Sequence, residues 1–188
     1  MTEESTPHTH HPKSGPARDR LPTPERIAAI GERLRERRPR IHVLTSPVAQ
    51  TFPANLLLAV GADPSMTISP EEVPAFVANA DALLVNLGML DRARRDASLT
   101  AIEVAKEEGV PWVLDPVKIE VSPSRLDFAR RLIDLEPALV HANHAEFRGL
   151  SGVEASETAV RDYAVHTLST LVVTGEVERV TDGKRLIG

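Results

Sequence analysis

Residues 82–115, ALLVNLGMLDRARRDASLTAIEVAKEEGVPWVLD, decide the fold. Within them, the apolar run Leu83–Asn86 predicts a buried strand. Asp91–Glu108 predicts a long helix, because alanine and valine residues recur on one face and a glycine follows. Trp112–Leu114 predicts the next strand. A strand, a helix and a strand in this order typically form a parallel pair against which the helix packs.

The same alternation continues on both sides of this unit. Further strands are predicted at Ile41–Thr45, Met66–Ile68, Ala138–Val140 and Thr170–Thr174. Further helices are predicted at Val48–Val60, Glu71–Ala78, Leu126–Ile133, Ala145–Leu150 and Thr158–Leu168. Near the end of the chain, short alternating runs around Asp182-Gly183 predict a hairpin. The pattern indicates an α/β fold with a largely parallel central sheet.

The N-terminal segment differs from the rest. Residues 1–22 contain four prolines, three histidines and one large aliphatic residue, Leu21, so we expect a disordered tail. The histidines could chelate a metal, but no further ligand is placed to complete such a site, and a solvated tail is favoured. Thr23 and Pro24 resemble an N-cap followed by the first residue of a helix. Residues 23–188 are therefore expected to form one domain.

Composition excludes several classes of protein. The 188 residues carry 22 Lys and Arg against 27 Asp and Glu, a net charge of -5, and only 3% aromatic residues, which argues against nucleic-acid binding. Without cysteine there is no disulfide, thiolate metal site or cysteine nucleophile in these residues. No apolar run approaches the roughly 20 residues that span a bilayer. A cytoplasmic protein without a membrane partner is expected.

Polar residues follow several predicted strands, where parallel sheets bind their ligands. Asp115 could hold a hard cation there, or could serve only as a turn residue. Asn143 and Glu146 have the spacing of a capping box, while the carboxylate could also bind magnesium. With Thr174 after the next strand, these groups suggest a nucleotide-phosphate site. No Walker loop, G-x-G-x-x-G run, catalytic triad or histidine metal site is evident.

Several motifs together resemble one family. They are, in order along the chain, VAQTFPANLLLAVGADPSM (48–66), ALLVNLG (82–88), PWVLDPV (111–117), NHAE (143–146), VVTGE (172–176) and VTDG (180–183). In this order they resemble hydroxyethylthiazole kinase, and they cover the chain from about Ile41 onward.

The resemblance implies a ribokinase-like three-layer fold and transfer of the γ-phosphate of ATP to the hydroxyl of 4-methyl-5-(2-hydroxyethyl)thiazole, with magnesium. It implies a homotrimer whose thiazole pocket lies between subunits. By matching position, Met66 would contact the thiazole and Thr174 would contact ATP. Asp115 and Glu146 would surround magnesium and phosphate.

The sequence also departs from the family pattern. His141 stands where the family has an ATP-contacting arginine, and a neutral imidazole offers no bidentate fork. Ser46 replaces an asparagine and Met89 a threonine. The family's G-T-G-C segment, which supplies backbone N–H groups to the transferring phosphoryl group, is expected downstream of Gly188. No catalytic residue is therefore assigned within residues 1–188, and the kinase domain is expected to be incomplete.

Three hypotheses remain open. The leading one is a hydroxyethylthiazole kinase whose 188 residues alone do not catalyse the transfer. The second is a catalytically inactive thiazole- or nucleotide-binding homologue, or a fragment of such a kinase. The third is another small-alcohol kinase of the ribokinase-like group, because Ser46 and Met89 lie near the expected substrate.

Overall fold

The computed structural model describes residues 22–188, so the tail predicted for residues 1–22 lies, except for Pro22, outside the described residues. The strands are β1 (Arg40–Leu44), β2 (Asp63–Ser65), β3 (Ala82–Asn86), β4 (Trp112–Asp115), β5 (Leu139–Asn143), β6 (Thr170–Thr174), β7 (Arg179–Thr181) and β8 (Leu186–Ile187). The α-helices are α1 (Pro24–Arg37), α2 (Thr51–Val60), α3 (Val73–Ala78), α4 (Arg92–Glu107), α5 (Pro123–Ile133), α6 (His144–Ser151) and α7 (Glu157–Thr167), and Ile119–Val121 forms a 3₁₀ turn.

In the described part of the chain the strands form one sheet in the order β2-β1-β3-β4-β5-β6-β7-β8. The six strands from β2 to β6 pair in parallel, and β7 and β8 add an antiparallel hairpin at one edge. The α/β fold with a mainly parallel sheet is thus confirmed. All the carboxyl ends of the parallel strands meet at one edge of the sheet.

The strand expected at Met66–Ile68 is wrong in its position. Pairing with β1 instead involves Asp63–Ser65, which follows α2 after a short turn. Pro64 is tolerated there because β2 is an edge strand. Proline has no backbone N–H, and in an edge strand that missing donor can fall on the side without a neighbouring strand. Met66 therefore lies just beyond the carboxyl end of β2.

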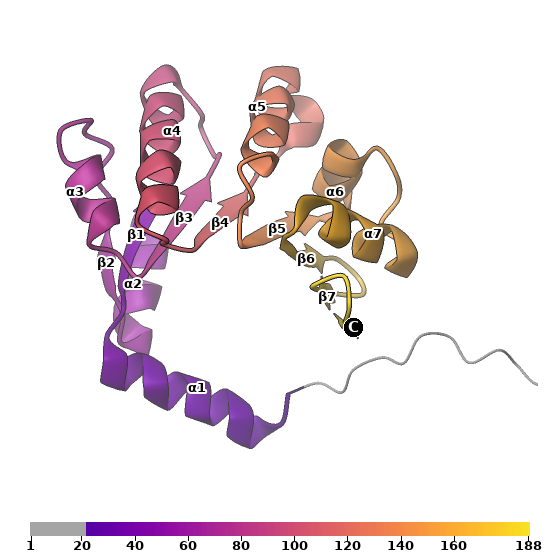
Figure 1. Ribbon diagram of the computed structural model, residues 1–188, viewed down its shortest axis with the longest axis horizontal. Helices are drawn as coiled ribbons and strands as arrows, with labels where there is room; N and C mark the ends of the chain where they lie inside the picture. The colour runs from indigo at the N-terminus through magenta and orange to yellow at the C-terminus, as the bar shows by residue number, and fades with distance from the viewer. Residues whose placement is uncertain (1–21) are drawn as a thin grey trace, which may run out of the picture.

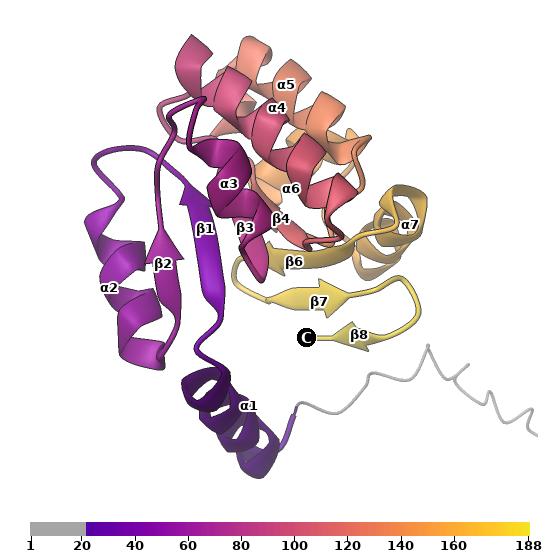
Figure 2. The same ribbon diagram turned by 60° about the vertical axis from the view of Figure 1, so that its left-hand side comes forward.

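One face of the sheet is covered by α3 to α7 (Figures 1 and 2). Alternate strand residues point into this layer, so that Leu83, Val85, Leu114 and Val140 are buried against the helices. Leu84 and Val113 occupy the intervening positions and are only partly buried. Burial thus follows the period of two expected for a sheet with one well-covered face.

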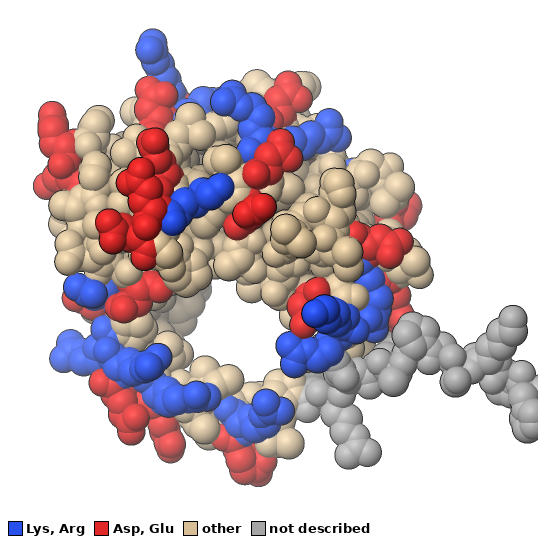
Figure 3. Space-filling model, in the orientation of Figure 1, with Lys and Arg blue, Asp and Glu red and all other residues tan. Residues whose placement is uncertain are grey.

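The opposite face is more open. Helix α1 begins at the predicted N-cap, where Thr23 Oγ1 accepts a hydrogen bond from the Arg26 amide, yet none of its residues is buried. A hollow of about 550 Å³ separates α1 from β6, β7 and β8, and it is visible in Figure 3. Among the described residues, no helix is both long and apolar enough to cross a bilayer.

Helix α2 ends at Gly61, as predicted, in a left-handed conformation with φ of 96°. A Cβ at this position would lie 2.9 Å from the Cα of Arg35, so glycine also permits the close approach of α1 to α2. The helix itself contains no buried residue, and its apolar side chains Phe52, Leu56 and Leu58 are exposed.

Candidate functional site

A row of polar groups lies across the carboxyl ends of β1, β3 and β4. Asn86 and Asp115 are register partners, and Asn86 Nδ2 donates a 2.7 Å hydrogen bond to Asp115 Oδ2. Asn86 Oδ1 accepts from the Gly88 amide at 3.0 Å and from Thr45 Oγ1 at 3.3 Å. These contacts determine which end of the Asn86 amide faces Asp115. Asn86 therefore orients the carboxylate.

Asp115 is a partly buried acid with a perturbed pKa. Burial raises the pKa of its carboxyl above the ordinary 3.8, and the nearby charge of Glu146 raises it further. The hydrogen bond from Asn86, the charge of His141 and a backbone hydrogen bond from Val117 oppose this rise. The fold thus brings Asp115, His141 and Glu146 close enough to interact electrostatically, as their places after neighbouring strands predicted.

Glu146 is buried, with 6% of its surface exposed, and both of its oxygens accept backbone hydrogen bonds. Oε2 accepts from the Asn143 amide at 2.8 Å, while Asn143 Oδ1 accepts from the Glu146 amide at 2.9 Å, which completes the capping box of α6. Oε1 accepts from the Lys118 amide at 2.8 Å. The capping interpretation is confirmed, and the same carboxylate also fastens the turn after β4.

That turn has an unusual backbone. Val117 and Lys118 have φ of 41° and 55°, in the left-handed region that side chains with a Cβ rarely adopt. The Glu146 hydrogen bond to Lys118 stabilises this conformation directly. The turn keeps Asp115 at the end of its strand, facing the same edge of the sheet as Asn143.

Thr174 ends β6 and pairs in register with Asn143 at the end of β5. Beyond it, Gly175 leaves room for His144, since a Cβ at residue 175 would lie 2.8 Å from His144 Nε2. Arg179 Nη1 approaches the same ring nitrogen at 3.4 Å. The predicted ATP-contacting residues His141 and Thr174 therefore lie on adjacent strands, and Arg179 lies beside His144, which follows the first of these strands.

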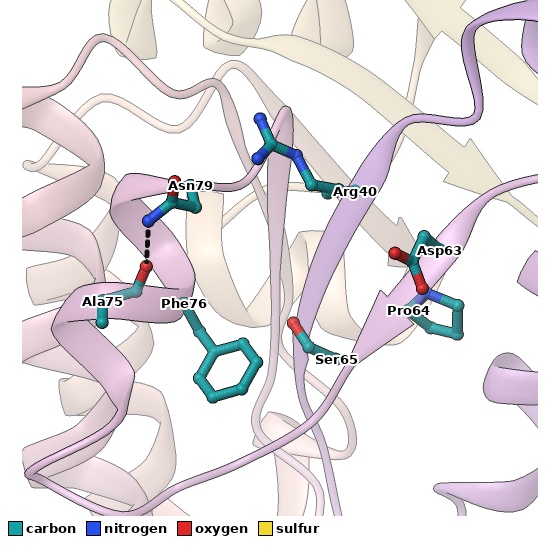
Figure 4. A pocket seen from close by; sticks show the side chains of 7 residues that line it. All are labelled: Arg40, Asp63, Pro64, Ser65, Ala75, Phe76 and Asn79. Carbon is teal, nitrogen blue, oxygen red and sulfur yellow. Dashed lines mark hydrogen bonds between the residues drawn. The ribbon is translucent and has the colours of Figure 1, made fainter.

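Met66 lies apart from this group. It follows the edge strand β2, three strand positions from β4 in the sheet order, which corresponds to about 14 Å at the usual strand spacing. A cavity of about 350 Å³ lies nearby between β1, β2 and α3 (Figure 4). Ser65 and Phe76 line it on opposite sides. The structure thus separates the predicted thiazole contact from the acidic groups.

Asp115 and Glu146 suit a magnesium ion that is held partly by water and phosphate, and not a metal that is held by protein side chains alone. Within residues 22–188, no three His, Cys, Asp or Glu side chains are grouped closely enough to hold a metal. Magnesium, however, is commonly held by one or two carboxylates together with waters and substrate phosphates. Asp115 and Glu146 fit that donor set.

The sequence placed Asn86 among the residues that follow predicted strands but gave it no role, and it did not point to Lys118 or Arg179. Asn86 could have been found, because it ends a buried strand directly before the strand of Asp115 and its amide can bond a carboxylate. Lys118 acts through its backbone amide, and Arg179 reaches His144 across the β6–β7 hairpin. Neither of these contacts leaves a signal in residue type or spacing.

Comparison with known proteins gives a consistent result. The model of the hydroxyethylthiazole kinase family matches residues 32–188. Hydroxyethylthiazole kinase of Yersinia enterocolitica is 42% identical over 176 residues, covering 86% of this chain and 68% of the relative. A probable hydroxyethylthiazole kinase of Agrobacterium fabrum is 52% identical over 126 residues, covering 67% of this chain and 51% of the relative.

Solved structures agree. Hydroxyethylthiazole kinase from Pyrococcus horikoshii OT3 has a TM-score of 0.80 and 35% identity, over 85% of this chain and 65% of the other. A ribokinase-like superfamily protein from Enterococcus faecalis, at 10% identity and a TM-score of 0.60, is similar in fold alone and covers 81% of this chain and 63% of the other. The chain thus spans between half and about 70% of the length of the relatives compared.

Proposed function

Because this chain belongs to the hydroxyethylthiazole kinase family, we propose that the protein to which these residues belong phosphorylates the hydroxyl of 4-methyl-5-(2-hydroxyethyl)thiazole with ATP and magnesium. The observation that carries the proposal is the Asn86–Asp115 pair beside Glu146 at the carboxyl ends of the strands. Family membership accounts for the use of ATP as a kinase substrate. The identity of the alcohol and the roles of individual residues are part of the proposal.

Asp115 and Glu146 are the residues that would hold magnesium, with Asp115 oriented by Asn86. Magnesium would neutralise charge on the phosphate oxygens of ATP when bound. The Thr174 hydroxyl would donate to a phosphate oxygen, and His141, on the neighbouring strand, would contact the nucleotide beside it. Met66 supplies a polarizable contact to the flat thiazole ring at the other end of the site.

Phosphoryl transfer needs donors aimed at the charge that develops on the transferred group. The G-T-G-C run that serves this purpose in the family does not occur in the 188 residues. We therefore expect these residues to bind the thiazole alcohol and magnesium-ATP without substantial turnover. A coupled assay of ADP release, run beside calorimetric titration of each ligand, tests this expectation, and substantial turnover contradicts it.

The second candidate function is a binding protein without kinase activity. It is favoured by Glu146, both of whose oxygens already accept backbone hydrogen bonds, and by His141 in place of the family arginine. Calorimetry distinguishes the two candidates. Binding of the thiazole alcohol without magnesium-ATP supports the binding protein, whereas binding of both supports the kinase. Binding of neither removes both candidates.

We also propose a homotrimer. Its support is the apolar surface of α2, where Phe52 is 76% exposed beside Leu56 and Leu58. Exposed apolar patches of this kind mark interaction surfaces. Light scattering coupled to size exclusion tests the assembly, and replacing Phe52 and Leu58 together with serine should shift the mass toward that of a monomer.

A further inference from the structure

His42 is a buried polar residue with no place in the site described above. It lies in the middle of β1 with none of its surface exposed, opposite Ser65 of β2 in the register. Both ring nitrogens are engaged: Nδ1 lies 2.8 Å from Ser65 Oγ, and Nε2 lies 3.1 Å from the carbonyl oxygen of Thr67. The two partners flank Met66.

The chemistry of these partners defines the proton positions. A carbonyl oxygen can only accept a hydrogen bond, so Nε2 carries the ring proton and donates a hydrogen bond to the Thr67 carbonyl oxygen. Nδ1 is then the acceptor for the Ser65 hydroxyl. Phe76 of α3 stacks on the imidazole at a centroid distance of 5.9 Å and an interplanar angle of 28°. The neutral ring is therefore held in one orientation from three sides.

Thr67, whose carbonyl oxygen bonds His42, also belongs to a polar network. Thr67 Oγ1 donates to Glu72 Oε2 at 2.5 Å and accepts from the Ser69 amide at 3.1 Å. Ser65 and Phe76, which both touch the imidazole, also line the cavity of Figure 4. Strand β2 has only three residues and lies at the edge of the sheet, so few backbone hydrogen bonds between strands restrain the chain just before Met66. His42 supplies side-chain bonds on both sides of that residue.

We propose that His42 is the positioning residue for Met66: its hydrogen bonds to the Ser65 hydroxyl and to the Thr67 backbone carbonyl restrain both neighbours of Met66 and so set where the Met66 side chain meets the thiazole ring. The identity of the ligand rests on the proposed function, whereas the immobilisation of Met66 by His42 is a property of the ligand-free chain. His42 acts through Met66 and does not itself touch the substrate.

Two substitutions separate hydrogen bonding from packing. H42F retains an aromatic ring against Phe76 but removes both hydrogen bonds. H42Q offers an amide N–H to the Thr67 carbonyl and restores that bond. V160A is the matched control, because Val160 is buried in α7 against the opposite end of the sheet. It lowers stability without touching β1 or β2.

The first readout needs no ligand. The chain has three methionines, so the ¹³C-methyl spectrum contains one signal each for Met1, Met66 and Met89, assigned with M66L and M89L. H42F should shift or broaden the Met66 signal and leave Met89 in place, while H42Q and V160A should resemble the wild type at Met66. An unchanged Met66 signal in folded H42F overturns the proposal, whatever the ligand.

The second readout is calorimetric titration with 4-methyl-5-(2-hydroxyethyl)thiazole. We expect H42F to weaken binding roughly tenfold, with H42Q near the wild type and magnesium-ATP binding unchanged. Equal thiazole affinity in H42F and the wild type overturns the proposal. If the wild type binds no thiazole, the proposed function fails, and the Met66 signal alone decides whether His42 positions that residue.

Discussion

Asp115 is an acid whose surroundings oppose its charge. Burial is the largest cause of its raised pKa, and Glu146 adds to it, yet Asn86 gives the carboxylate a donor. An acid with a raised pKa in the folded state contributes stability below its ordinary pKa and loses that contribution as the pH rises through the folded value. At neutral pH the charge of Asp115 therefore costs stability, as is common for residues retained for function.

The D115N variant should separate these two roles. Its amide oxygen still accepts from Asn86, so we expect stabilisation on the order of 0.5–1 kcal/mol at pH 7 and a Tm increase of roughly 1–4 °C. The difference should shrink as the pH falls through the raised pKa of Asp115 and its carboxyl takes up a proton. Magnesium-ATP binding should be lost while thiazole binding remains, as measured by calorimetry. A D115N chain that is less stable than the wild type at pH 7 contradicts this account.

His42 should make stability depend on pH in the opposite sense. Burial lowers its pKa below the ordinary 6.5, and the hydrogen bond to Thr67 only partly opposes this. A histidine with a lowered pKa binds fewer protons in the folded state, so stability falls as the pH drops below about 6.5. Thermal unfolding from pH 8 to 5 should show the wild type losing Tm relative to H42Q. Parallel curves for the two proteins would exclude His42 as the cause.

At the scale of single elements, the N-terminus of α6 is bonded both to its own capping residue and to the turn that follows Asp115. Its capping box satisfies two backbone donors, and the same Glu146 reaches Lys118 on another segment. A helix start is thereby coupled to the left-handed turn after β4. The carboxylate that caps α6 therefore also acts on the turn after β4 and, through its charge, on the pKa of Asp115.

The N143A variant tests the cap. Loss of the side-chain acceptor for the Glu146 amide should cost about 1 kcal/mol of folding stability, measured by urea unfolding. The N143S control retains an acceptor at the same position and should lose only a few tenths of that amount. Equal losses in both variants would show that the cap does not stabilise α6.

At the scale of the whole molecule, the sheet is covered unequally. Helices α3 to α7 bury one face, while α1 stands across a hollow from the other (Figures 1 and 3). Parallel sheets usually have helices on both faces. The folding stability that is lost when a strand side chain is truncated should therefore depend strongly on which face of the sheet the side chain occupies.

Leu114 and Val113 test this asymmetry on one strand. Leu114 is fully buried in the helical layer, so L114A should cost about 2–5 kcal/mol. Val113 faces the opposite side and is partly exposed, so V113A should cost about 1 kcal/mol or less. Urea midpoints measure both. Similar midpoints would mean that the second face is buried in solution.

Much of this architecture could be predicted from local pattern. The alternation of apolar strands and amphipathic helices is confirmed, as are the Thr23 cap and the Gly61 terminus, because each depends on residues close in the chain. The strand near Met66 was displaced because its pairing with β1 is set by the turn after α2. The metal, nucleotide and thiazole roles of Asp115, Glu146, His141, Thr174 and Met66 stay predictions.

By itself, the sequence determined the fold class and the family, because periodicity and ordered motifs are properties of the chain. Only the tertiary structure decided that Asn86 bonds Asp115, that Glu146 clamps Lys118 and that His42 holds both neighbours of Met66. Each of these contacts joins residues at least 23 positions apart. Their distances depend on strand register and helix placement, which no local pattern of residue types contains.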